Sequence, residues 1–250
     1  MSGIKALVAR GYADGALGAI ICEPEGGEVC IAQKGSLRLR LISYGRIAHG
    51  AMPREGVNAL AGLIRVLNKV LDLEAQLAAS YGEHPLLGPA YISPTVAQAP
   101  TSGDYSQINC LPDRAEAYLD IRSFPAIEHD ALIGRIRRLM EDVRTEQPAY
   151  RFGIDVVDDR PSTEIAPFHP LVRSLINAHE RIYGSAPPLG GVPGSTDGTI
   201  LARDRNIPVV VYGPGDKHIP HQPDEYVDLD DVARAAQVYI IAALALLGHA

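Results

Sequence analysis

The sequence predicts an α/β protein in which an antiparallel ferredoxin-like domain interrupts a second domain of helices and buried strands. Residues 36–157 alternate between strand and helix patterns in the order β-α-β-β-α-β, which is the order of the ferredoxin-like fold. Residues 1–35 and 158–250 instead contain continuous apolar runs, which are typical of strands buried in parallel sheets. We therefore expect the first and third pieces of the chain to form one domain together.

The overall composition disfavours several functional classes. The chain has 250 residues, of which 46% are hydrophobic, so it is long enough to build a core. Its net charge of −7 argues against a nucleic-acid partner. Cys22, Cys30 and Cys110 have no CxxC spacing and predict free thiols in a reducing cytoplasm. Neither a signal-peptide pattern nor a long apolar span is visible, so we expect a cytoplasmic protein without a membrane partner.

The first piece, residues 1–35, contains the apolar run "LGAIICEP", which predicts a buried strand. Glu23 follows the carboxyl end of this strand, where α/β folds place their ligand sites. A solvated loop residue is the alternative for a lone glutamate before a proline. Glu23 is therefore a candidate binding residue that needs partners from elsewhere in the chain.

The middle piece begins with "SLRLRLISYG", in which Leu37, Leu39 and Leu41 alternate with arginines as in a half-exposed antiparallel strand. An amphipathic helix follows, with apolar residues at helical spacing between Leu60 and Leu71. The remaining elements are two strands, a second amphipathic helix and a last strand, at "AYISPTVAQ", "AEAYLDIRS", "HDALIGRIRRLMEDVR" and "RFGIDVVDD".

Three polar residues of the middle piece are candidates for function. His49 lies on the loop between the first strand and the first helix, Asn109 precedes a turn, and Arg122 ends a strand. An arginine in such a place can hold a carboxylate through two parallel hydrogen bonds. Ordinary surface positions are the alternative for His49 and Arg122.

The last piece predicts a helix at "HPLVRSLINAHERIYG", a buried strand at "NIPVVVYGPG" and a final helix with Asp228 as its N-cap. Before that strand, the glycine-rich turn "GGVPGSTDG" leads into another helix, and exposed N–H groups in it could receive an anion. The turn lacks the lysine of a phosphate-binding loop. His221 follows the buried strand on a loop that alone supplies too few ligands for a metal site.

Five stretches of the chain occur together in one order and spacing. They are "CEPEGG", "AHGAMPREGVNA", "NCLPDRAEAYLDIRSFP", "GVPGSTDGTILARDRNIPVVVYGPG" and "HQPDEYVDLDD". This set resembles the dinuclear zinc hydrolases that include acetylornithine deacetylase, succinyl-diaminopimelate desuccinylase, aminoacylase and carboxypeptidase G, and the resemblance covers essentially the whole chain. It implies a zinc-bearing α/β domain that is interrupted by a ferredoxin-like lid, which also dimerises.

The resemblance implies a divided metal site. Glu23 is similar to the carboxylate ligand of one zinc ion, and His221 is similar to the histidine ligand of the other. The complete site of the family holds two zinc ions, with cobalt or manganese as substitutes. His218 matches no ligand position, and we interpret His218, Asp224 and Glu225 as loop structure.

The resemblance also implies roles around the substrate. His49 is similar to the lid histidine that reaches into the partner subunit's site and stabilises the developing oxyanion. Asn109 and Arg122 are similar to lid residues that hold the substrate, Arg122 by its carboxylate. The Gly194–Ser195–Thr196 turn is similar to a backbone element near that carboxylate.

Several motifs of the family are missing from the chain. These are an H-x-D pattern, a second aspartate that bridges the metals, and a Glu-Glu pair that supplies the general base and a further ligand. Because Met1 falls just after the position of that pair, we expect an N-terminally truncated member with an unpaired sheet edge and an apolar face. A stable zinc site needs three or four ligands, so the isolated chain is expected to be inactive alone.

The implied activity is that of a metal-dependent amide hydrolase, a deacylase or peptidase of N-acyl amino acids or small peptides, acting as a homodimer through the lid. Thr199 stands where desuccinylases carry an arginine after this turn, which weakens a desuccinylase assignment. The alternative is a non-catalytic dimerisation or binding protein, a degenerate or split-gene homologue that keeps the lid.

Overall fold

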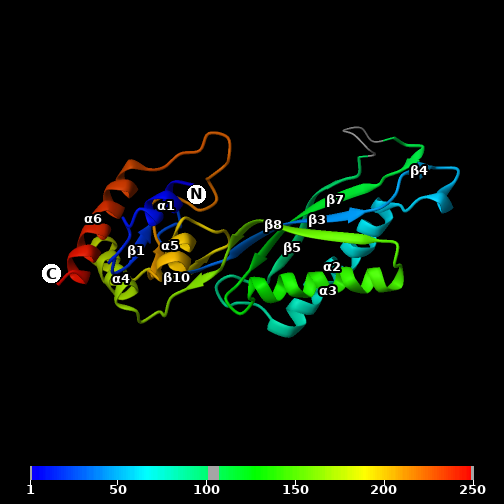
Figure 1. Ribbon diagram of the computed structural model, residues 1–250. Helices are drawn as coiled ribbons and strands as arrows, with labels where there is room; N and C mark the ends of the chain where they lie inside the picture. The colour runs from blue at the N-terminus through cyan, green and yellow to red at the C-terminus, as the bar shows by residue number, and fades with distance from the viewer. Residues whose placement is uncertain (1, 101–106, 249–250) are drawn as a thin grey trace. The chain divides into compact units, whose positions relative to one another are not determined.

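The computed structural model describes residues 2–100 and 107–248, and the chain divides into two compact units. Unit 1 consists of Met1–Gly35, Pro85–Leu87 and Ser162–Ala250. Unit 2 consists of Ser36–His84 and Gly88–Pro161. Figure 1 traces the helices and strands of both units along the chain. The short segment Pro85–Leu87 packs with unit 1 although its neighbours in the sequence belong to unit 2.

Unit 1 is built on a five-stranded sheet with the order β1-β11-β2-β10, in which β9 pairs with β2. Its strands are β1 Ala19–Ile21, β2 Val29–Gln33, β9 Thr163–Glu164, β10 Leu189–Val192 and β11 Val209–Val211. β1 runs parallel to β11, and β10 runs parallel to β2, whereas β11 and β9 are antiparallel to β2. The sheet is therefore mixed, and not parallel throughout as the apolar runs predicted.

The first predicted strand is shorter and less buried than expected. The run "LGAIICEP" forms only the three residues of β1, all of them half-buried. β1 stands at the end of the strand order, where β11 is its one strand neighbour within the described residues. Leu17, just before β1, is 59% exposed, so the apolar run is not buried along its whole length.

The helices of unit 1 are α1 Ser2–Ala9, α4 Pro170–Tyr183, α5 Gly198–Arg205 and α6 Leu229–Leu246. α4 and α6 pack against each other and bury Leu175 and Val238 beside Val210 of the sheet. The Asp228 side chain accepts a hydrogen bond from the Asp230 N–H, so the predicted N-cap of the last helix is confirmed. α6 also carries exposed apolar side chains, at Val232, Ile240 and Leu244.

Unit 2 confirms the predicted β-α-β-β-α-β order. Its elements are β3 Gly35–Tyr44, α2 Ala59–Tyr81, β5 Tyr91–Gln98, β7 Arg114–Ser123, α3 His129–Glu146 and β8 Arg151–Arg160. The four strands form one sheet in the order β5-β7-β3-β8, and α2 and α3 pack against it and against each other. A separate pair of short strands joins β4 Ala48–His49 to β6 Cys110–Leu111, and a 3-10 turn spans Pro53–Glu55.

The side chains of β3 divide between two faces as their alternation predicted. Leu37, Leu39 and Leu41 are fully buried in the core of unit 2. Arg38 and Arg40 point to the other face, where they form ion pairs with Asp120 and Asp155. One face of the sheet therefore supplies the core, and the other carries charge.

Helix α2 buries one part of the apolar set that its helical spacing indicates and leaves another part exposed. It buries Leu63, Val66, Val70, Leu73 and Leu77. It leaves Leu60, Ile64 and Leu71 exposed, so α2 presents a second apolar stripe.

Across residues 2–100 and 107–248, no helix is long and apolar enough to cross a membrane.

Candidate functional site

A cavity of about 540 Å³ in unit 1 brings together residues from distant parts of the sequence. Glu23 and His221, the two candidate metal ligands, both line it. The Gly194–Ser195–Thr196 turn forms another part of its wall, so five of the candidate residues meet in one place. Loops position all of them, because Glu23 follows β1, the turn follows β10, and His221 lies between β11 and α6.

His221 has a backbone conformation that is uncommon for a residue with a side chain. Its φ angle is 68°, which lies in the left-handed region. The N–H of His221 donates a hydrogen bond to the carboxylate of Glu225 over 2.9 Å. His221 and Glu23 are both exposed, so the imidazole and the carboxylate are accessible to a ligand in the cavity.

The turn is held in place by Gln33, a fully buried residue at the end of β2 that the sequence did not indicate. The Oε1 atom of Gln33 accepts hydrogen bonds from the N–H of Thr196 at 3.2 Å and from its hydroxyl at 2.6 Å. The Nε2 atom of Gln33 donates to the Thr163 hydroxyl over 3.2 Å. Thr196 therefore uses both its N–H and its hydroxyl for hydrogen bonds within the chain.

Two charged residues of the cavity were not among the sequence-based candidates. Glu25 is buried and accepts a hydrogen bond from the Cys30 thiol over 3.6 Å, and burial raises the pKa of its carboxyl group. Lys217 donates to Glu28 over 2.7 Å, and this hydrogen bond raises the pKa of the lysine. The second glutamate of "CEPEGG" and the lysine of "GDKH" were the available sequence signals.

In unit 2, His49 and Asn109 lie close together. His49 ends β4, where it pairs with Cys110, and the carbonyl oxygen of Asn109 accepts the Gly50 N–H over 2.6 Å. The Nδ1 atom of His49 accepts a hydrogen bond from the Ala51 N–H over 3.1 Å. His49 therefore stands on a short paired strand, and not on the free loop that the sequence predicted.

Arg122 lies at the other end of the neighbouring strand. Eight residues separate it from Arg114, the first residue of β7, and a rise of about 3.3 Å per residue makes that distance roughly 26 Å. The guanidinium of Arg122 contacts both carboxylate oxygens of Asp120, at 2.6 and 3.1 Å. Arg122 thus lies one residue before the end of its strand, and its guanidinium is paired with a carboxylate of its own chain.

Glu23 and His221 suit zinc in their chemistry, although two donors are fewer than a stable site requires. Carboxylate oxygen and imidazole nitrogen are ordinary zinc ligands. His218 lines the same cavity, with its N–H held by Asp216 over 2.8 Å. In the described part of the chain, no group of three or more histidine, cysteine, aspartate or glutamate side chains is arranged to hold a metal ion.

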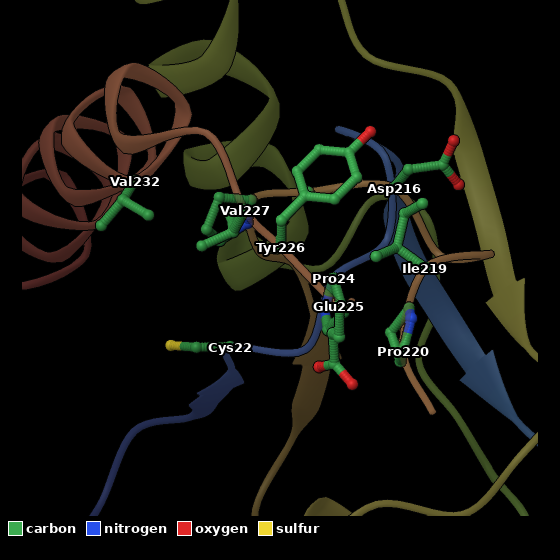
Figure 2. A pocket seen from close by; sticks show the side chains of 11 residues that line it. Cys22, Pro24, Asp216, Ile219, Pro220, Glu225, Tyr226, Val227 and Val232 are labelled. Atoms are coloured by element: carbon green, nitrogen blue, oxygen red, sulfur yellow. The ribbon is translucent and has the colours of Figure 1, made fainter. Parts of the chain in front are cut away.

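A second cavity of about 370 Å³ adjoins the first and shares Pro24 and Pro220 with it (Figure 2). Its walls are mainly apolar, with Ile219, Val227 and Val232 among the lining residues. Glu225 also lines this cavity, whereas His221 lines the first one. The loop after β11 therefore presents the histidine and its carboxylate partner to different cavities.

Comparison with known protein sequences identifies relatives along almost the whole chain. The model of the M20 peptidase dimerisation domain matches residues 31–147. A probable succinyl-diaminopimelate desuccinylase of Staphylococcus aureus is 25% identical over 98% of this chain and 64% of its own length. An uncharacterized metallohydrolase of Methanococcus maripaludis is 24% identical over 87% of this chain and 54% of its own length. The chain thus spans less than two thirds of these relatives.

Solved structures share the fold of the chain. An aminopeptidase of Bacillus cereus superposes with a TM-score of 0.75 at 19% identity, over 98% of this chain and 61% of the other. An M20 family metallo-carboxypeptidase of Sulfolobus solfataricus gives a TM-score of 0.69 at 15% identity, over 98% and 67%. The resemblance inferred from the sequence motifs is confirmed: residues 31–147 match the M20 peptidase dimerisation domain, almost the whole chain is similar to a probable succinyl-diaminopimelate desuccinylase, and its fold is that of the M20 peptidase structures.

Proposed function

We propose that this chain forms part of a zinc-dependent amide hydrolase, a deacylase or peptidase that acts on N-acyl amino acids or small peptides. The observation that carries the proposal is the 540 Å³ cavity. Glu23, His221 and the Gly194–Ser195–Thr196 turn all line it. Residues from three separate loops of the sequence meet there with the donor types that a hydrolytic metal needs.

Glu23 and His221 are the residues that would hold metal in this site, with two zinc ions in the complete centre and cobalt or manganese as substitutes. When bound, a divalent metal supplies polarisation of the amide carbonyl and activation of water. Residues of the chain itself do the remaining work of binding and orientation. The N–H groups of Gly194 and Ser195 are the turn donors that we assign to a substrate carboxylate.

The lid residues act from two subunits in this proposal. His49 and Asn109 lie together beside β6, which precedes β7 in the chain, whereas Arg122 stands near the far end of β7, roughly 26 Å from its first residue, Arg114. This separation is longer than an N-acyl amino acid, so one copy of unit 2 cannot place all three side chains on one small substrate. The separation supports a model in which His49 and Asn109 act in the site of the partner subunit, whereas Arg122 acts in the site of its own subunit.

We propose that the homodimer forms along α2 and the edge strand β5. The exposed stripe of Leu60, Ile64 and Leu71 lies on α2, which packs against β5. β5 has β7 as its one strand neighbour within the described residues, and its Tyr91 is 46% exposed. An exposed apolar helix stripe beside the edge strand of a sheet is a surface that a second copy would cover.

The dimer surface is tested by placing a charge in it. Ile64→Asp is expected to shift the protein from dimer to monomer in sedimentation velocity experiments. Val157→Asp, on the opposite edge strand β8, introduces the same charge at a similarly exposed valine and is expected to leave the dimer intact. Equal effects of the two variants would assign the dimer interface elsewhere.

The 250-residue chain is proposed to be inactive by itself, because Glu23 and His221 leave each metal ion with one protein ligand. The apolar face of α6 and the half-paired β1 support this view, since both are surfaces on which further polypeptide could pack. Its free cysteines fit a reducing compartment such as the cytoplasm.

Metal analysis and activity together test the proposed function. The purified chain is expected to retain fewer than two zinc ions after dialysis. Two tightly held ions would contradict the proposal that this chain supplies only one protein ligand to each metal ion. The chain should be co-expressed with the part of the S. aureus relative that lies outside the matched region. The pair should then hydrolyse N-acyl amino acids or dipeptides. Glu23→Ala and His221→Ala should abolish that activity, whereas Glu180→Ala, on the exposed side of α4, should not.

A non-catalytic dimerisation or binding protein is the second candidate function. The observation that favours it is that the matching family model describes the dimerisation domain, at residues 31–147. Such a protein would dimerise normally but show no hydrolysis with any complementing segment. Activity that disappears with Glu23→Ala would exclude this candidate.

A further inference from the structure

His221 is held in a backbone conformation that its own chemistry disfavours. Its φ angle of 68° places it in the left-handed region, which only a few per cent of residues with a side chain adopt. Asp224, three residues later, has a φ of 59° and lies in the same region. A loop with two such residues needs specific contacts to keep this shape, because relaxation to an ordinary conformation would redirect the His221 side chain.

The neighbouring residues remove much of the freedom of this loop. Pro220 and Pro223 each have a fixed φ near −65°. Gln222 precedes a proline and is restricted to extended conformations. The remaining choice lies at His221 and Asp224, and the hydrogen bond from the His221 N–H to Glu225 spans both of them. A hydrogen bond to an ionised carboxylate is among the stronger ones available to a backbone N–H.

The side chains of His221 and Glu225 line different cavities, and the hydrogen bond between these two residues links them. The His221 side chain lines the 540 Å³ cavity that also holds Glu23. The Glu225 side chain lines the adjoining 370 Å³ cavity, with Pro24 and Pro220 beside it (Figure 2). Glu225 therefore lines a different cavity from His221, while its carboxylate holds the backbone N–H of His221.

We propose that Glu225 is a positioning residue, which locks His221 in the left-handed conformation and so presents its imidazole to the metal cavity. The metal part of this inference rests on the proposed function, whereas the backbone part rests on the loop geometry alone. Residues that orient a metal ligand commonly change metal affinity by roughly tenfold or more when they are removed. Loss of the Glu225 acceptor is expected to weaken zinc binding at His221 by about that factor.

The loop offers a matched control. The N–H of His218 donates to the carboxylate of Asp216 over 2.8 Å, so this histidine also has its backbone held by an acidic side chain. His218 is not in the set of positive-φ residues and is not an assigned ligand. Asp216→Ala removes a comparable bond from the same loop without touching His221. Glu225→Gln keeps an oxygen acceptor at the same distance from the backbone and serves as the conservative variant.

The test uses the whole chain and zinc chloride alone as the probe. Nuclear magnetic resonance follows the amide exchange rate of His221 and the zinc-induced shift of its ring proton. Glu225→Ala should accelerate exchange at His221 and raise the zinc concentration for half-maximal shift about tenfold. Glu225→Gln should stay within about threefold of the wild type in both measurements. Asp216→Ala should change the exchange of His218 only.

Each outcome decides one part of the inference. Unchanged amide exchange at His221 in Glu225→Ala, or equal loss in Glu225→Gln, overturns the positioning role whatever zinc does. Exchange that depends on Glu225 while zinc leaves the ring proton of the wild type unmoved overturns zinc binding at His221 in this chain but keeps the positioning role. Dependence of both measurements on Glu225, with recovery in Glu225→Gln, supports the two together.

Discussion

The two units of this chain contain sheets of similar strand number that are built in different ways. In unit 2, β3, β7 and β8 are each 10 residues long, and helices of 23 and 18 residues pack against them. In unit 1, β1 and β11 have 3 residues, and β2, the longest strand, has 5. Long strands commit most side chains to a core, whereas short strands soon release the chain into loops. The candidate metal cavity lies in the unit with the short strands.

Buried polar groups show the same contrast. In unit 1, Gln33 fixes a loop that lines the cavity. In unit 2, the Ser123 hydroxyl lies 2.7 Å from His129 Nε2, and His129 Nδ1 lies 2.6 Å from Asp159. This Ser-His-Asp arrangement is similar to a catalytic triad, but Ser123 is completely buried and out of reach of a substrate. It therefore ties the start of α3 to the sheet.

The largest expected effect concerns the core of unit 2. Leu39→Ala should lower the free energy of unfolding of this unit by about 3–5 kcal/mol, because Leu39 is completely buried. Hydrogen exchange with mass spectrometry separates the two units in this measurement. Val156→Ala is the control, since Val156 is the cross-strand neighbour of Leu39 but is 48% exposed. Equal losses for the two variants would mean that unit 2 lacks the tightly packed core described here.

The next effect concerns the hydrogen bonds from Thr196 to Gln33 in unit 1, which we call the polar staple. Gln33→Leu should destabilise unit 1 by about 2–3 kcal/mol, because it leaves the Thr196 N–H and hydroxyl buried without their acceptor. The amide of Thr196 should exchange faster as a result. Gln237→Leu, on an exposed position of α6, makes the same chemical change and should have little effect. Normal protection of Thr196 in Gln33→Leu would argue against the staple.

A smaller effect of opposite sign is expected at Glu25. Burial raises the pKa of this carboxyl above 4.5, so the folded state disfavours its ionised form and loses stability as pH rises through that region. Glu25→Gln should therefore raise the melting temperature of unit 1 at pH 7, and the gain should vanish below about pH 4.5. Glu180→Gln, at an exposed position, should show no such difference. A melting temperature lowered by Glu25→Gln would contradict the prediction.

The smallest effect is a pH dependence from His179. Burial lowers the pKa of this histidine below 6.5, so the unfolded chain takes up its proton first as pH falls. The stability that His179 contributes is complete above pH 6.5 and is lost below it. His179→Phe should flatten this slope for unit 1, whereas His84→Phe in unit 2 should not. An unchanged slope in His179→Phe would assign the titration to another group.

Most of unit 2 could be predicted from the sequence because its information is local. The alternation of leucines and arginines in β3 specifies a strand with one buried face, and that pattern needs no knowledge of distant residues. The position of β1 depended instead on its neighbours. Its apolar run is compatible with a central strand, and only its place at the end of the strand order makes it half-buried.

The candidate site was predictable in its members but not in its supports. Motif resemblance brought Glu23, His221 and the turn together, and the structure places all of them on one cavity. Gln33 carries no pattern of its own, because its role depends on hydrogen bonds to residues far along the chain. Glu225 was interpreted as loop structure, since a left-handed backbone at His221 cannot be read from residue types.

The central claim is that Glu23 and His221 contribute to one metal centre. Titration of the isotope-labelled chain with manganese(II), which takes carboxylate and imidazole ligands, tests it most directly, because paramagnetic line broadening reports nearby nuclei. We predict that substoichiometric manganese broadens the side-chain signals of Glu23 and His221 together, at the same metal-to-protein ratio. Broadening at one of the two residues without the other would contradict the account.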